Sequence, residues 1–209
     1  PPRVGYSTLN GADMEVPFFW AISDQTDATF YQRYMTKRGY MQGLEFRYLL
    51  DRDSEGIYFF NILSDQKEKD LSDPDDVKIS PFRRSNNTRY WFLGKSDQSL
   101  PLGAELRLDA DYVSDQDYLR EFQEGLFGLR LRPDLVNEFG RPVEEKRSAL
   151  RTSNLRLSRD RDNYSLQAGS SFSEQAADPD LQDETPQPLL GLNFILPTKQ
   201  ILDFPIFFN

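Results

Sequence analysis

The stretch AELRLDADY, residues 104–112, alternates apolar and polar side chains at every position. Successive side chains of a β-strand point to opposite faces, so a period of two residues predicts a strand whose faces meet different surroundings. One face would carry Leu106, Leu108, Ala110 and Tyr112, and the other Glu105, Arg107, Asp109 and Asp111. The same pattern recurs in QGLEFRYL (42–49), NYSLQAGSSF (163–172) and LLGLNFIL (189–196). In the first of these, Glu45 and Arg47 oppose an apolar face.

Further strands are predicted along the rest of the chain, and only one short helix is expected. The additional strand ranges are 3–9, 13–21, 27–36, 56–63, 88–95 and 147–158, and the helix is DYLREF at 117–122. About ten strands joined in chain order predict an all-β fold, an antiparallel up-and-down meander.

The expected connections alternate in length. Short turns are predicted at 23–27, 51–55, 96–103 and 159–163, and long loops at 64–87, 114–146 and 173–187. Short connections near 10–12 and 37–40 fall at the long-loop end, so the alternation is a tendency. Outer-membrane β-barrels have short turns at one end and longer loops at the other. The loops therefore favour part of a large transmembrane barrel, although a soluble β-sandwich that binds carbohydrate or a partner shows the same strand alternation.

In a barrel, charged side chains point away from lipid, so we expect one face of the strands to line a lumen. The predicted lumen-facing polar residues are Glu45, Arg47, Glu105, Arg107, Asp109 and Asp111. Tyrosine and tryptophan side chains on the other face would suit the level of the lipid headgroups.

Composition excludes several classes of function. The 209 residues carry a formal net charge of −9, which argues against binding nucleic acid. The chain has no cysteine and no histidine, so disulfides, thiolate metal sites and imidazole triads are absent. Glu105 and Asp109 would lie about 13 Å apart along a strand, too far for a glycosidase pair. We expect no enzyme, no cofactor and no metal, and DLSDPDD (70–76) is expected to be a solvated acidic loop.

Two further expectations concern the membrane. The longest apolar run, VPFFWAI (16–22), is far shorter than the roughly 20 residues of a membrane-spanning helix. The first residues show neither a basic n-region nor an apolar h-region, so no signal peptide is expected there.

A proline interrupts the apolar strand MEVPFFWAIS, residues 14–23. Proline has no amide hydrogen, so Pro17 cannot donate a hydrogen bond to a neighbouring strand. Such a residue is typical of an edge strand, a β-bulge or the start of a strand. The sequence alone does not distinguish these three positions for Pro17.

Several irregular motifs resemble the LptD family of lipopolysaccharide-assembly outer-membrane proteins, also called organic solvent tolerance proteins or OstA. They are VPFFWAI (16–22), DAT (27–29), KRG (37–39), LEFRYL (44–49) and ADYVSDQDYLREF (110–122), in the family's order. SLPLGAELRL and ILPTKQILDFPIFF fit more loosely. The resemblance covers most of the chain, and it implies that residues 1–209 are the N-terminal portion of a barrel domain without its jellyroll and remaining strands.

The resemblance also implies a location, partners and a gate. It places the protein in the bacterial outer membrane, with lipopolysaccharide, an LptE-like lipoprotein plug and an LptA-like periplasmic bridge protein as partners. In the family, two prolines weaken the seam between the first and last strands of the barrel, through which lipopolysaccharide leaves sideways. The resemblance implies that these prolines correspond to Pro2 and Pro17 here, with Pro1 as the alternative first position. The resemblance predicts a curved antiparallel sheet with free edges for this part of the barrel.

Overall fold

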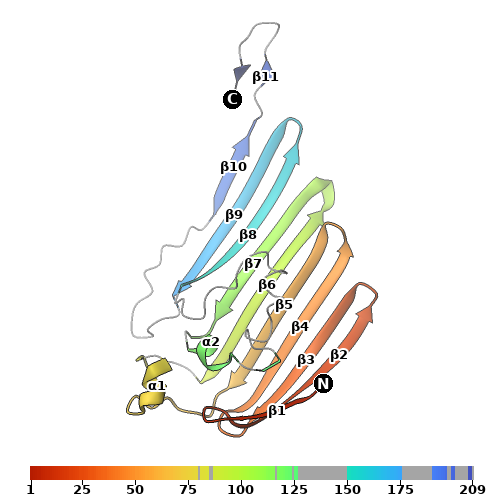
Figure 1. The fold of residues 1–209 in the computed structure, drawn as a ribbon. Helices are drawn as coiled ribbons and strands as arrows, with labels where there is room; N and C mark the ends of the chain where they lie inside the picture. Colours follow the sequence, from red (N-terminus) through yellow and green to blue (C-terminus); the bar gives the residue numbers. More distant parts are fainter. Residues whose placement is uncertain are drawn as a thin grey trace.

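A computed structural model gives one large antiparallel sheet whose ten strands follow chain order (Figure 1). It describes residues 1–79, 81–84, 87–115, 117–123, 125–126, 150–175, 190–196, 199–200 and 207–208. The strands are β1 (Arg3–Ser7), β2 (Gly11–Ser23), β3 (Thr26–Met35), β4 (Gly39–Asp51), β5 (Ser54–Ser64), β6 (Thr88–Leu100), β7 (Ala104–Val113), β8 (Leu150–Arg161), β9 (Tyr164–Gln175) and β10 (Gly191–Ile195). The predicted meander is confirmed.

Three smaller elements and a separate strand pair complete the described part. They are helix α1 (Pro74–Ile79), a 3-10 turn (Pro101–Gly103), helix α2 (Tyr118–Glu121) and the strands β11 (Lys199–Gln200) and β12 (Phe207–Phe208). The helix expected at 117–122 is confirmed as α2, whereas α1 and the β11–β12 pair were not predicted. Neither helix of the described residues has the length and apolarity that crossing a membrane requires.

One turn boundary differs from the prediction. A turn was expected from residue 96, but β6 continues to Leu100 and pairs with β7 down to Ala104. Residues 96–99 are polar, so their propensity favoured a turn; pairing with the strongly alternating β7 keeps them extended. The predicted start of the eighth strand, 147–149, lies outside the described residues.

The connections of the sheet alternate in length as expected. The four turns at one end, between β2 and β3, β4 and β5, β6 and β7, and β8 and β9, have two or three residues each. The connections β5–β6, β7–β8 and β9–β10 at the other end are long, while β1–β2 and β3–β4 are short there too. Within the described strands, β1 and β10 form the two edges and do not pair with each other, so the sheet is open.

The two faces of the sheet differ in chemistry. Cross-strand register places Leu44, Phe60, Phe92 and Tyr112 side by side on one face, which we call the outer face. The next rung, on the opposite or inner face, holds Glu45, Phe59, Leu93 and Asp111. The outer face continues apolar across β2 and β8–β10, where large hydrophobic side chains lie exposed.

Part of the inner face is apolar, which the sequence pattern had not predicted. A short stretch of chain, the described residues 117–123 and 125–126, packs on this face and is called the inner segment (Figure 1). The resulting core comprises Met35, Met41, Ile57, Phe59, Leu63, Trp91, Leu93, Val113, Tyr118, Leu119 and Phe122. Inner-face side chains of β5 and β6 can be apolar because the inner segment removes them from water.

Candidate functional site

The strand edge at β1 carries the two prolines singled out by the sequence. β1 pairs with β2 from Ser7 opposite Gly11 to Arg3 opposite Glu15. Pro17 lies two residues beyond that last pair, and Pro2 directly precedes Arg3. On its other side, β2 pairs with β3 in constant register from Asp13 to Ala21, and Pro17 stands opposite Tyr31. Both prolines therefore lie where the β1–β2 ladder ends, and the β2–β3 ladder keeps its register past Pro17.

A cavity of about 460 Å³ lies on the inner face beside Pro17. Its lining residues are Pro1, Pro17, Phe19, Asp27, Thr29, Tyr31, Glu45, Arg47 and Leu126. Tyr31 donates a hydrogen bond from its hydroxyl to Glu45 Oε2 at 2.9 Å, and Arg47 Nε donates to Glu45 Oε1 at 2.6 Å. The lining of this cavity thus combines a hydrogen-bonded polar cluster with the apolar side chains of Pro1, Pro17, Phe19 and Leu126.

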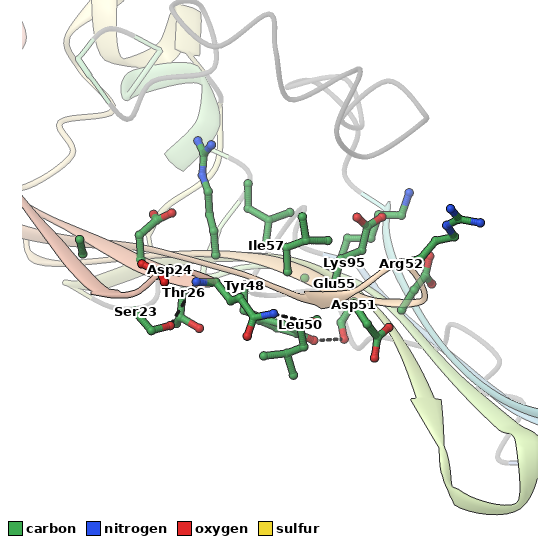
Figure 2. A pocket seen from close by; sticks show the side chains of 18 of the residues that line it. Ser23, Asp24, Thr26, Tyr48, Leu50, Asp51, Arg52, Glu55, Ile57 and Lys95 are labelled. Atoms are coloured by element: carbon green, nitrogen blue, oxygen red, sulfur yellow. Dashed lines mark hydrogen bonds between the residues drawn. The ribbon is translucent and has the colours of Figure 1, made fainter.

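A larger hollow of about 1010 Å³ lies at the short-turn end of β2–β6 (Figure 2). Figure 2 shows Ile57 and Lys95 on one side of the sheet and Leu50 on the other. Gln25, in the β2–β3 turn, is linked to the end of β4, because its Nε2 donates to Leu50 O at 2.7 Å. The lining mixes cations and carboxylates, namely Arg47, Arg52 and Lys95 with Asp24, Asp27, Asp51, Glu55 and Asp97. Because carboxylates outnumber cations here, this lining suits a hydrated surface better than a site for one anion.

The six predicted lumen-facing residues all lie on the inner face, but they form separate groups. Register places Glu45 and Asp111 on one rung and Arg47 and Asp109 on the next. Arg107 and Glu105 lie nearer the short turns, where Arg107 Nη2 and Glu105 Oε2 are 3.2 Å apart and both side chains are about half exposed.

Glu45 and Asp111 are buried. The Asp111 carboxylate accepts hydrogen bonds from Trp91 Nε1 and Arg151 Nη1, each at 3.1 Å. The structure therefore brings Glu45 together with Arg47, and Arg107 together with Glu105, while Asp111 pairs with a residue of β8.

A buried ionic cluster, which the sequence pattern did not predict, lies at the long-loop end of the inner face. Three arginines and three carboxylates meet there: Arg38, Arg84, Arg89, Asp65, Asp115 and Glu121. Arg38 follows β3, Asp65 follows β5 and Arg89 is the second residue of β6, while Glu121 lies on α2. The cluster therefore joins the inner segment to the ends of three strands.

Contacts within the cluster are short and repeated. Arg38 Nη1 donates to Asp65 Oδ2 at 2.8 Å and Arg38 Nη2 to Glu121 Oε1 at 3.0 Å. Arg89 Nη1 donates to the same Asp65 oxygen at 2.9 Å, and Arg89 also contacts Glu121. Both guanidinium groups, Arg38 and Arg89, lie over the ring of Phe122, 5.0 and 5.1 Å from its centroid. Buried charges of this kind need such partners, because an unpaired buried charge is costly.

Electrostatics keep the Glu121 carboxylate ionised. Burial raises the pKa of Glu121, but the nearby Arg89 and Arg38 outweigh it and lower that pKa to about 2. Burial raises the pKa of Tyr118, which lies beneath the cluster. With equal numbers of cationic and anionic groups, the cluster is suited to holding segments together.

Among the described residues, no group of three or more histidine, cysteine, aspartate or glutamate side chains is placed to hold a metal ion. The sites described above thus comprise an open strand edge with two prolines, two hollows on the inner face, and an ionic cluster.

No family model matches the chain. Curated proteins do match it. LPS-assembly protein LptD of Nitrosospira multiformis is 34% identical over 137 residues, which are 66% of this chain and 13% of that protein. LptD of Legionella pneumophila (strain Lens) is 33% identical over 133 residues, 63% of this chain and 16% of that protein. The chain is an LptD-like fragment. LptD of Aeromonas salmonicida agrees, with 34% identity over 119 residues, 56% of this chain and 14% of that protein.

The LptD relatives settle the resemblance found in the sequence. The match covers only 13% to 16% of their length, so the chain corresponds to a small part of such a protein. The antiparallel meander agrees with the outer-membrane barrel fold expected for LptD, with the described sheet as an unclosed part of it. LptD proteins are outer-membrane proteins of Gram-negative bacteria, which confirms the expected location.

Proposed function

We propose that this chain forms part of the barrel wall through which an LptD protein assembles lipopolysaccharide into the outer leaflet. The observation that carries the proposal is the outer face of the sheet, which is apolar and has exposed large hydrophobic side chains on β2 and β8–β10, in a chain related to LptD. Phe18 and Trp20 on β2 are 62% and 51% exposed, and Leu192 on β10 is 68% exposed. Apolar patches of that extent are rare on proteins in water and are suited to lipid.

The alternative, a soluble β-sandwich that binds carbohydrate or a partner, is less well supported. A sandwich buries one face of each sheet against a second sheet of similar size. In the described part of the chain, the second sheet has only two strands, and the apolar outer face of the ten-stranded sheet lies exposed. The kinship with LptD favours the barrel as well.

The edge formed by β1 is proposed to be one side of a lateral gate. Pro2 and Pro17 flank the point where the β1–β2 ladder ends, and each removes one backbone donor. Fewer inter-strand hydrogen bonds make separation easier in lipid, where each unsatisfied backbone group costs several kcal/mol. Lipopolysaccharide would leave through this seam, between β1 and the last strand of the whole protein.

The partners follow from the same proposal. Lipopolysaccharide is the transported molecule, and the hollows of the inner face, with Glu45, Arg47, Glu105, Arg107, Asp109 and Asp111, would line the lumen. An LptE-like lipoprotein plug and an LptA-like bridge protein would act with the whole protein. The chain is proposed to be no enzyme, and its net charge of −9 disfavours nucleic acid.

A cross-link across the seam tests the gate. One cysteine replaces Val4 on β1, whose side chain is 77% exposed, and the other stands on the last strand of the full-length protein. Joining them with a short bifunctional reagent should stop the appearance of new lipopolysaccharide at the cell surface. The control pair, Leu44→Cys and Phe60→Cys, joins strands that are already neighbours and should leave export unchanged. Export that continued under the seam cross-link would refute the gate.

A further inference from the structure

The inner segment reaches back across the sheet to the strand that carries Pro17. Leu126 N–H donates a hydrogen bond to Glu15 Oε2 at 2.7 Å, although the two residues are 111 positions apart in the chain. Glu15 lies on the inner face of β2 and is 1% exposed. It is also the residue of β2 that faces Arg3 in the last β1–β2 pair, two positions before Pro17.

Gly125 fits closely against the same strands. Its φ of +119° is a backbone conformation that L side chains rarely adopt. A Cβ on this residue would stand 2.8 Å from Arg33 Nη1 and 3.0 Å from Glu15 Oε2. Arg33 faces Glu15 across the β2–β3 ladder, and its Nε donates to Asp13 Oδ1 at 3.0 Å. The backbone at 125–126 is therefore seated on a charged pair of residues from β2 and β3, and only glycine fits there.

At its other end, the inner segment is fixed by Glu121. That carboxylate contacts Arg38 and Arg89, which lie beyond β3 and at the start of β6. The segment thus spans the inner face from β6 to β2 and is anchored by hydrogen bonds at both ends. A strap held at two points restrains the strands between them from moving apart.

From these contacts we infer that Glu15 is a positioning residue that, through Leu126, ties the inner segment to β2 and restrains opening of the β1–β2 edge. The inference rests on the proposed gate for its purpose, but the restraint itself is a property of the sheet. Glu15, Gly125 and Leu126 together are called the latch. Release of the latch would free the inner face of β2 beside Pro17, where the β1–β2 ladder already ends.

Hydrogen exchange in the full-length protein, purified in lipid nanodiscs, tests the latch. Glu15→Ala leaves the half-buried Leu126 N–H without its acceptor and should speed amide exchange in residues 11–16 about tenfold. Glu15→Gln should restore most of the protection, because an amide oxygen can still accept that hydrogen bond. If Glu15 acted only through its negative charge, alanine and glutamine would speed exchange equally, because both variants remove that charge.

A second variant reaches the latch from the other side and leaves Glu15 intact. Gly125→Ala should displace Leu126 N–H and speed exchange in residues 11–16 by a similar factor. The double variant Glu15→Ala/Gly125→Ala should exchange in residues 11–16 about as fast as Glu15→Ala alone, because both changes remove the same hydrogen bond. The matched controls are Glu105→Ala, an exposed inner-face carboxylate, and Gly5→Ala, where a Cβ would meet nothing within 4 Å.

The outcomes separate the latch from the gate. Faster exchange in the latch variants but not in the controls supports the latch. Exchange in residues 11–16 that is unchanged in Gly125→Ala, or equally fast in Glu15→Gln and Glu15→Ala, overturns it. Neither result depends on lipopolysaccharide export, so failure of the seam cross-link experiment would overturn the proposed function and leave the exchange result standing.

Discussion

Removing one charge from the buried ionic cluster should loosen the inner segment strongly. Glu121→Gln keeps the shape of the side chain but leaves three arginines facing only two carboxylates. Arg38 and Arg89 are both 0% exposed, so solvent cannot compensate for the lost charge. Breaking a buried pair from one side costs about 3–5 kcal/mol. Local opening of the inner segment should therefore become about a hundredfold to several thousandfold more frequent.

A neutral double replacement is the decisive comparison. Arg38→Met combined with Glu121→Leu removes one charge of each sign, so the remaining groups of the cluster still balance. Apolar replacement of a whole buried pair is often close to neutral. The double variant should therefore be more stable than Arg38→Met alone or Glu121→Leu alone.

Hydrogen exchange of the amides at Leu119–Phe122 measures this opening directly, with limited proteolysis as a second readout. The exchange rate in the double variant should lie close to that of the native protein. If the double variant instead lost as much protection as the two single variants added together, the charges would be acting independently, and the account of the cluster as one balanced unit would be wrong.

Three further predictions concern pH and the outer face. The pKa of Glu121 is lowered to about 2, so the stability that its carboxylate gives the folded protein is complete above about pH 4.5. This stability is lost as the pH falls from about 4.5 to about 2. Amide exchange at Leu119, followed against pH, should show that window. Gly56→Ala would place a Cβ 2.5 Å from the ring of Tyr48. It should lower the free energy of unfolding, measured in urea, by about 1–3 kcal/mol, and by less when Tyr48 is also replaced by alanine. Leu155→Arg on the outer face should cost about 2–4 kcal/mol of folding in lipid vesicles, while the adjacent inner-face Asn154→Arg should cost close to nothing; equal costs would contradict the assignment of the faces.

The strands were predictable because the two faces of most of them differ. Residues 104–112 alternate without exception, and the structure makes them β7. Their partner β6 alternates less well, since YWFL at 90–93 is apolar on both faces. The loss of alternation there, and in YFFNIL at 58–63, was the signal that something covers the inner face. The inner segment is what covers it.

The ionic cluster could not be predicted in the same way. Arg38 lies in a turn and Asp65 follows a strand, positions where charged residues are normally solvated. Arg38 is 27 residues from Asp65 and 83 from Glu121, so no short-range spacing relates these residues. The prolines behaved differently: a missing backbone donor is a property of the residue itself, and Pro17 could be noticed before any fold was known.

The long chain separation of the inner segment's contacts has a consequence for how the protein folds. Glu121 meets Arg38 across 83 residues, and Leu126 meets Glu15 across 111. Contacts that close long loops are entropically expensive and form slowly, whereas each hairpin of the meander needs only its neighbour. We therefore expect the strands to pair first and the inner segment to dock last. Until it docks, the buried arginines have no carboxylate of α2 opposite them, so completion of the charge balance marks the final step of assembly.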